Sequence, residues 1–114
     1  MTENYSEYTK SLSIELAKIR QEIPEVMSGF SQMAAGALKP GALDKKTKEL
    51  IAMALAVGNR CGGCIGFHAQ ALVKLQASRE EFMEMLGMAI YMGGGPSLMY
   101  AAEALSAFEE FSKN

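Results

Sequence analysis

Apolar residues recur at intervals of three and four along most of the chain, which is the spacing of one face of an α-helix. The first such stripe runs over residues 8–23, and charged residues such as Lys10 and Glu15 lie off it. Its members are Tyr8, Leu12, Leu16, Ile19 and Ile23. Pro24 either ends this helix or opens the next one. The pattern predicts an amphipathic helix near the start of the chain.

Start and stop signals divide the middle of the chain into three further helices. A second apolar face covers residues 26–38 and ends at the turn signal of residues 39–41. Asp44 is the expected N-cap of a helix that begins at Lys45 and stops near residues 58–59. We expect another helix to follow the Cys-Gly-Gly-Cys segment and to run to about Gln76.

The last part of the chain predicts two more helices. Ser78 and Glu81 fit a capping box, and three glycines at 93–95 followed by Pro96 separate the two helices. The expected apolar faces are Phe82, Met85, Leu86, Met88, Ala89 and Met92 in one, and Leu98, Met99, Ala102, Leu105, Phe108 and Phe111 in the other. No segment shows the alternation of a strand. The predicted fold is all-α, a single domain of about six helices that spans residues 1–114.

Composition narrows the classes of partner. The net charge is −2, so nothing indicates a nucleic-acid surface or an anionic membrane surface. The most apolar window, residues 86–92, is too short to span a bilayer, and the first residues lack the apolar segment of a signal peptide. We therefore expect a cytoplasmic protein. Hydrophobic residues make up 49% of 114 residues, which predicts that some apolar surface is buried in a homo-oligomer.

The candidate chemistry lies between residues 49 and 68. Cys61 and Cys64 are the only cysteines, and His68 is the only histidine. If this segment is helical, the three side chains fall within about 60° of one another around the axis. Two thiols and a base on one stripe indicate a redox or nucleophilic site. In the cytosol, such a pair is more often catalytic or metal-binding than a structural disulfide.

These residues alone leave open which of the two cysteines, Cys61 or Cys64, reacts first. Only a thiolate attacks peroxide or disulfide, and a helix N-terminus stabilises a thiolate, which favours Cys61 as the nucleophile. Proximity to the imidazole of His68 favours Cys64 instead. Glu49 would orient His68 or hold the proton itself. A sulfenic acid formed on one sulfur would be trapped by the other as a disulfide, with the intervening glycines free to bend.

The spacing of Glu49, Cys61, Cys64 and His68, with the preceding segment LDKKTKELIAMALAV, resembles the AhpD-like alkylhydroperoxidase branch of the carboxymuconolactone decarboxylase family. The resemblance covers roughly residues 43–75. It implies an all-helical subunit that assembles as trimers or hexamers and reduces hydroperoxides with thiols. It also implies that peroxide oxidises Cys64, that Cys61 resolves it, and that Glu49 and His68 relay protons. AhpD itself has a further histidine where this chain has Gly63, and it is about twice as long.

The resulting hypothesis is an oxidoreductase, a peroxidase or disulfide reductase without cofactor or metal, that takes electrons from a dithiol or thioredoxin-like donor. Four alternatives remain open. The cysteines could be inert core residues, with Glu49 paired to Lys45 or Lys46. Cysteine, histidine and glutamate side chains could bind zinc. The chain could be a carboxymuconolactone decarboxylase-type lyase, although it lacks an arginine cluster. It could also be a non-catalytic scaffold.

Overall fold

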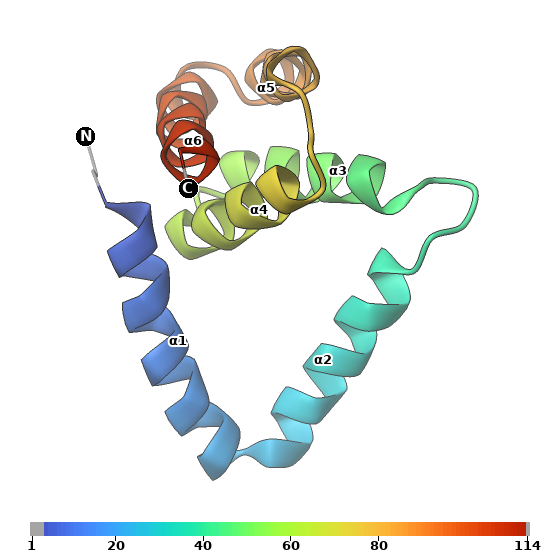
Figure 1. The fold of residues 1–114 in the computed structure, drawn as a ribbon, viewed down its shortest axis with the longest axis vertical. Helices are drawn as coiled ribbons and strands as arrows, with labels where there is room; N and C mark the ends of the chain where they lie inside the picture. The colour runs from blue at the N-terminus through green and yellow to red at the C-terminus, as the bar shows by residue number, and fades with distance from the viewer. Residues whose placement is uncertain (1–3, 114) are drawn as a thin grey trace.

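The computed structural model describes residues 4–113, and these form six helices joined by short turns (Figure 1). The helices are α1 (Tyr5–Glu22), α2 (Pro24–Leu38), α3 (Lys45–Gly58), α4 (Gly62–Lys74), α5 (Arg79–Gly93) and α6 (Gly95–Ser112). No strand occurs within residues 4–113. The all-α prediction with six helices is therefore confirmed.

Helices α3 to α6 pack together and supply nearly all of the hydrophobic core. Every buried apolar side chain except Tyr5 comes from these four helices. Phe82 of α5 stacks on Phe108 of α6, with ring centroids 4.2 Å apart and an interplanar angle of 17°. Met53 of α3 and Ile65 of α4 are fully buried beside them in the same core. We call these four helices the bundle.

Helix α1 is attached to the bundle at its N-terminal end. The backbone N–H groups of Tyr5 and Ser6 donate to the two carboxylate oxygens of Glu110, each at 2.9 Å. The Tyr5 hydroxyl hydrogen-bonds to Oε1 of Glu103 at 3.1 Å. Glu110 therefore satisfies N–H groups that the first turn of a helix leaves unpaired. This contact places the N-terminal half of α1 against α4 and α6.

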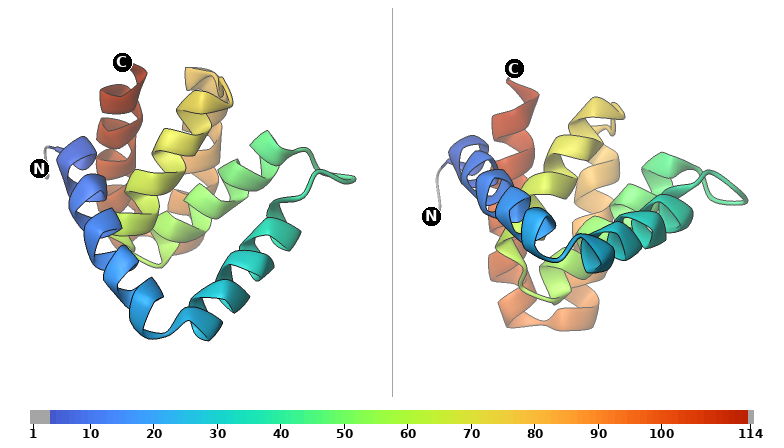
Figure 2. Two further views of the ribbon diagram at one scale, coloured as in Figure 1. Left: turned by 60° about the horizontal axis from the view of Figure 1, so that its bottom comes forward. Right: turned by 90° about the horizontal axis from the view of Figure 1, so that it is seen from below.

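Helix α2 contacts only α1 and α3, and none of its residues is buried. Figures 1 and 2 show α1 and α2 as the two arms of a V, with its apex at residue 23, away from the bundle. The exposed fractions are 64% for Val26, 60% for Phe30 and 64% for Met33. The apolar face predicted for residues 26–38 thus exists, but this chain alone does not cover it.

Two predicted helix starts are confirmed by their caps, whereas α4 begins at Gly62, inside the Cys-Gly-Gly-Cys segment, and ends at Lys74. The Asp44 carboxylate accepts from the Thr47 N–H at 2.7 Å, and Ser78 and Glu81 form the reciprocal capping box. The Thr47 hydrogen bonds lower the pKa of Asp44, and the hydrogen bond from the Ser78 backbone lowers the pKa of Glu81. Between α5 and α6, Gly94 has φ +72°, a left-handed conformation that glycine adopts without steric cost.

In three helices this chain does not bury every residue of the predicted apolar face. In α6, Leu98 and Met99 are exposed, and Ala101, Ala104 and Ala107 are buried instead. In α5, Met88 and Met92 are exposed. On the first apolar stripe, Tyr8 and Ile19 of α1 are exposed, and so is Ile23, the C-cap of α1. The physical reason in α6 is close packing: small alanines let the helices approach, so the larger side chains lie on the outer face.

Among residues 4–113, none of the six helices combines the length and the apolar character that crossing a membrane requires.

Candidate redox site

The turn from α3 to α4 fixes the position of the first cysteine. The Cys61 N–H donates to the Ala56 carbonyl at 3.0 Å, and the Arg60 N–H donates to the Val57 carbonyl at 3.2 Å. These two bonds form a Schellman motif, in which the residue after the C-cap is left-handed. Arg60 occupies that position with φ +56°. The turn at the end of α3 therefore places Cys61 at the start of α4.

Cys61 is the N-cap of α4, and its Sγ accepts a hydrogen bond from the Cys64 N–H at 3.2 Å. The two cysteines are joined by a disulfide, with a Cα–Cα distance of 5.2 Å. Both residues are half-buried. Sulfur at a helix N-terminus lies where the partial positive charge of the helix stabilises a thiolate. The site can therefore form an intrachain disulfide, and its geometry favours the thiolate form of Cys61 on reduction.

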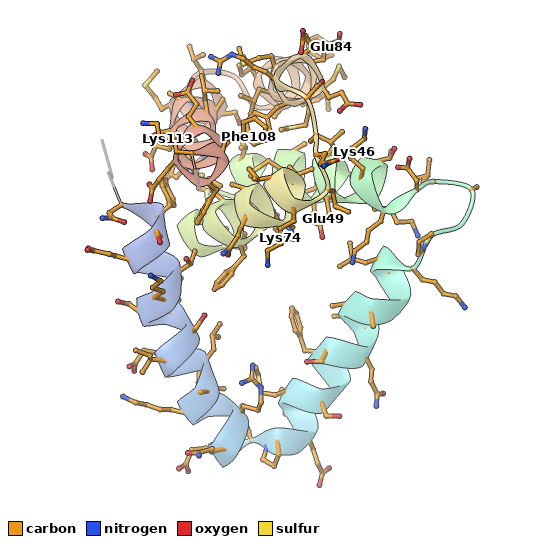
Figure 3. All side chains as sticks on the ribbon, in the orientation of Figure 1. Lys46, Glu49, Lys74, Glu84, Phe108 and Lys113 are labelled. Atoms are coloured by element: carbon orange, nitrogen blue, oxygen red, sulfur yellow. A yellow bond between two sulfur atoms is a disulfide. The ribbon has the colours of Figure 1, made fainter. Side chains whose placement is uncertain are left out.

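Glu49 and His68 form the second part of the site. The His68 Nδ1 and Glu49 Oε1 atoms are 2.6 Å apart, across the contact between α3 and α4. Glu49 is 4% exposed, while the His68 side chain is 30% exposed. Figure 3 shows Glu49 where α3 and α4 lie together. A carboxylate accepts at Nδ1, so Nδ1 carries the proton and Nε2 is left as the acceptor.

The glycines between and after the cysteines allow α1 to approach α4 closely. A Cβ atom on Gly63 would lie 2.8 Å from Cδ1 of Leu12, and one on Gly66 would lie 2.6 Å from Cγ2 of Thr9. A Cβ on Gly62 would lie 3.5 Å from the Tyr8 hydroxyl. At Gly63, where AhpD has histidine, α1 therefore fills the space that a side chain would need. The sequence alone indicated only backbone bending for Gly62 and Gly63, and no role for Gly66.

The structure brings together the residues that the sequence singled out. Glu49 contacts His68, Cys61 is bonded to Cys64, and Cys64 and His68 are four residues apart in α4. Cys61 lies just outside the helix, not on its stripe. Within residues 4–113, neither sulfur hydrogen-bonds to His68 in this disulfide form, and no three His, Cys, Asp or Glu side chains are grouped to hold a metal ion.

One part of the site was missed. His68 also lines an apolar groove between α2 and α3, together with Lys48 and Leu55. The groove depends on how α2 lies against α3, and no local spacing reports that arrangement. Lys48 gave a weak signal, since it lies next to Glu49 in a helix that begins with several lysines.

The sequence pattern of the carboxymuconolactone decarboxylase family matches residues 24–107, from the start of α2 into α6. The chain belongs to the carboxymuconolactone decarboxylase family. The match includes all four candidate residues but not α1, so the helix that packs against Gly63 lies outside the matched span.

Solved structures of this family share the fold. A carboxymuconolactone decarboxylase family protein from Legionella pneumophila, in its apo form, is 71% identical, with a TM-score of 0.94 over 96% of this chain and 97% of that one. A Thermotoga maritima family member with a possible role in antioxidative response is 29% identical, with a TM-score of 0.72 over 87% and 91% of the two chains. The family fold is therefore shared well beyond close sequence similarity.

Sequence relatives extend over almost the whole chain. An uncharacterised Cupriavidus necator protein is 37% identical over 109 residues, which is 96% of each chain. An uncharacterised Haemophilus influenzae protein is 33% identical over 108 residues, 95% of this chain and 96% of that one. Both relatives are described only as uncharacterised proteins.

Proposed function

We propose that this family member is a thiol-dependent peroxidase that reduces hydroperoxides with Cys61 and Cys64. The observation that carries the proposal is the pair of contacts in one site: a disulfide between the two cysteines, and a buried carboxylate held at 2.6 Å from the only histidine of the chain. The possible antioxidative role of the Thermotoga maritima protein supports the same class of chemistry.

Peroxide oxidises Cys64 in the first step. Its thiolate attacks one peroxide oxygen, an S–O bond forms, the O–O bond breaks, and an alkoxide leaves and takes a proton. The hydroperoxide gains two electrons and becomes an alcohol, while Cys64 becomes a sulfenic acid. We assign this role to Cys64 because it lies one helical turn before His68 in α4.

Cys61 completes the oxidation. Its thiolate attacks the sulfenic sulfur of Cys64, an S–S bond forms, the S–O bond breaks, and hydroxide leaves and is protonated to water. The hydrogen bond from the Cys64 N–H to Cys61 Sγ favours the attacking thiolate. A dithiol or thioredoxin-like donor then reduces the disulfide, and its own two thiols become a disulfide. In a disulfide reductase the reduced Cys61–Cys64 pair would instead pass its two electrons to a substrate disulfide, and the pair would itself become the disulfide.

Glu49 and His68 move the proton in this scheme. With Nδ1 held by Glu49, the Nε2 atom of His68 takes the proton of the Cys64 thiol and returns it to the leaving alkoxide. The buried carboxylate stabilises the imidazolium that forms between these two transfers. Glu49 is therefore a positioning residue, because it acts through His68.

The proposal is tested by peroxide consumption with a dithiol donor, alongside metal analysis of the same sample. We expect turnover that stops in both Cys61→Ser and Cys64→Ser. Mass spectrometry after mild peroxide should show the loss of two hydrogens from the reduced chain, reversed by a dithiol. Zinc in stoichiometric amount that survives dialysis, with no such mass change, would overturn the peroxidase in favour of a metal site.

A further inference from the structure

An apolar groove of about 340 Å³ lies between α2 and α3, and His68 forms part of its wall. Its walls are otherwise aliphatic, with Ala34 and Leu38 from α2 and Ile51 and Leu55 from α3. The only charged or polar side chains that line it are Lys48 and His68. This volume is near the lower end of small-molecule sites, which hold roughly 300–1,000 Å³.

The groove has a direction that follows α3. Its Lys48 end lies beside the Glu49–His68 pair, because Glu49 follows Lys48 and contacts His68. Its other end is at Leu55, and the following residue, Ala56, accepts the Cys61 N–H through its carbonyl. The two ends are seven residues apart, or about 10 Å along a helix. Neither cysteine lines the groove, so a ligand that extends from Lys48 runs along α3 in the direction of the helix end that precedes Cys61.

Lys48 is available to bind an anion. Its side chain is half-buried, and its Nζ donates one hydrogen bond, to the Lys39 carbonyl at 2.6 Å. No carboxylate pairs with Lys48 in the described part of the chain, and an ammonium has three donors. Nearby Lys46 is already paired with Glu81 at 2.9 Å. Lys48 is thus the unpaired cation at the mouth of an aliphatic groove.

We propose that the groove binds a medium-length aliphatic carboxylate, with the carboxylate on Lys48 and the chain along Ile51 and Leu55. As a substrate, the ligand would be a fatty-acid hydroperoxide whose peroxide group is remote from the carboxylate. That second statement rests on the proposed function, whereas binding of the carboxylate does not. Charge complementarity at Lys48 favours this ligand over an uncharged alkyl hydroperoxide, which the aliphatic walls alone would also accept.

The test uses octanoate and octanol as unreactive probes and the ring signals of the single histidine, His68, as the NMR reporter. We expect saturable shifts of the His68 signals with octanoate, and binding of octanol weaker by about tenfold. Lys48→Met should bring octanoate to the level of octanol. Lys45→Met, which removes an exposed lysine three residues away on the same helix, should leave the preference unchanged.

Three results would overturn the inference. They are equal binding of octanoate and octanol by the wild type, the same loss in Lys45→Met as in Lys48→Met, and no shift of His68 with either probe. The last would mean that another copy of the chain covers the groove. A turnover arm compares a fatty-acid hydroperoxide with its methyl ester. If octanoate binds through Lys48 but neither peroxide is consumed, the proposed function fails and the binding site stands.

Discussion

The bundle and the pair formed by α1 and α2, which we call the arm, contain similar amphipathic helices. They nevertheless bury their apolar faces to very different extents. Phe82 in α5 is fully buried against Phe108, whereas Phe30 in α2 is 60% exposed. Both phenylalanines lie on apolar helical stripes that the sequence alone does not distinguish. An amphipathic helix therefore predicts that its apolar face is covered, but not whether the covering surface belongs to the same chain. In α2 we expect it to come from another subunit.

The largest expected effect is on the free energy of unfolding, measured by chemical denaturation of two matched variants. Phe82→Ala should lower it by about 3–5 kcal/mol, because it leaves a cavity beside Phe108. Phe30→Ala should lower it by less than about 0.5 kcal/mol at concentrations where the protein is monomeric. Equal losses in the two variants at high dilution would mean that α2 is buried within its own chain.

Glu49 and His68 belong to the bundle, and Phe30 of α2 does not line the groove that contains His68, so the reaction should not depend on Phe30. His68→Ala should slow thiol oxidation on the order of the 10²–10⁴-fold that a positioned base supplies, and Glu49→Ala should slow it less. Phe30→Asp, in the arm, should leave the rate within about twofold of wild type in the assembly-deficient monomer. Stopped-flow loss of free thiol after peroxide addition measures all three. A larger loss in Phe30→Asp than in Glu49→Ala would show that the arm is part of the reacting site.

The arm should determine assembly instead. We expect a homo-oligomer, a trimer or a hexamer, in which the stripe of Val26, Phe30 and Met33 is covered. Phe30→Asp should shift light-scattering masses toward the monomer at micromolar concentration. Ser28→Asp changes an exposed residue on the opposite side of α2, and it should leave the light-scattering mass unchanged. A wild type that stays monomeric in this range would contradict the prediction.

The smallest expected effect is on the melting temperature at acidic pH. The pKa values of Asp44 and Glu81 are lowered by their capping hydrogen bonds in the bundle, so both caps stabilise the fold most when ionised. That stabilisation is present above the ordinary Glu value of 4.5 and is lost as pH falls through the lowered pKa. Glu81→Gln should therefore flatten the acid limb of the melting temperature measured by circular dichroism. If Glu81→Gln loses stability at acidic pH as steeply as the wild type, the capping box does not cause that loss.

Local signals in the sequence predicted much of the fold. Asp44, Ser78 and Glu81 mark helix starts because a cap is a contact within a few residues. The inward face of α6 was not predicted, since the burial of Ala101 and Ala104 over Leu98 depends on how closely neighbouring helices pack. The exposure of α2 could not be predicted either, because its stripe is as apolar as a buried one.

The candidate site divides in the same way. The spacing of Cys61, Cys64 and His68 was enough to single them out, because they lie in one short segment. Glu49 was found through its spacing in a known family, and its contact with His68 joins two helices. Lys48 and the packing of Leu12 on Gly63 were missed, since each depends on helices that meet only in three dimensions.

We propose that Cys64 reacts with peroxide and that Cys61 resolves the sulfenic acid as a disulfide. The most direct measurement is a dimedone-type trap of sulfenic acid, read by mass spectrometry on single-cysteine variants after a peroxide pulse. We expect an adduct on Cys64 in Cys61→Ser and none in Cys64→Ser. An adduct on Cys61 in Cys64→Ser, with none in Cys61→Ser, would contradict it. The thiolate at the N-terminus of α4 would then be the nucleophile, and Cys64 would resolve it.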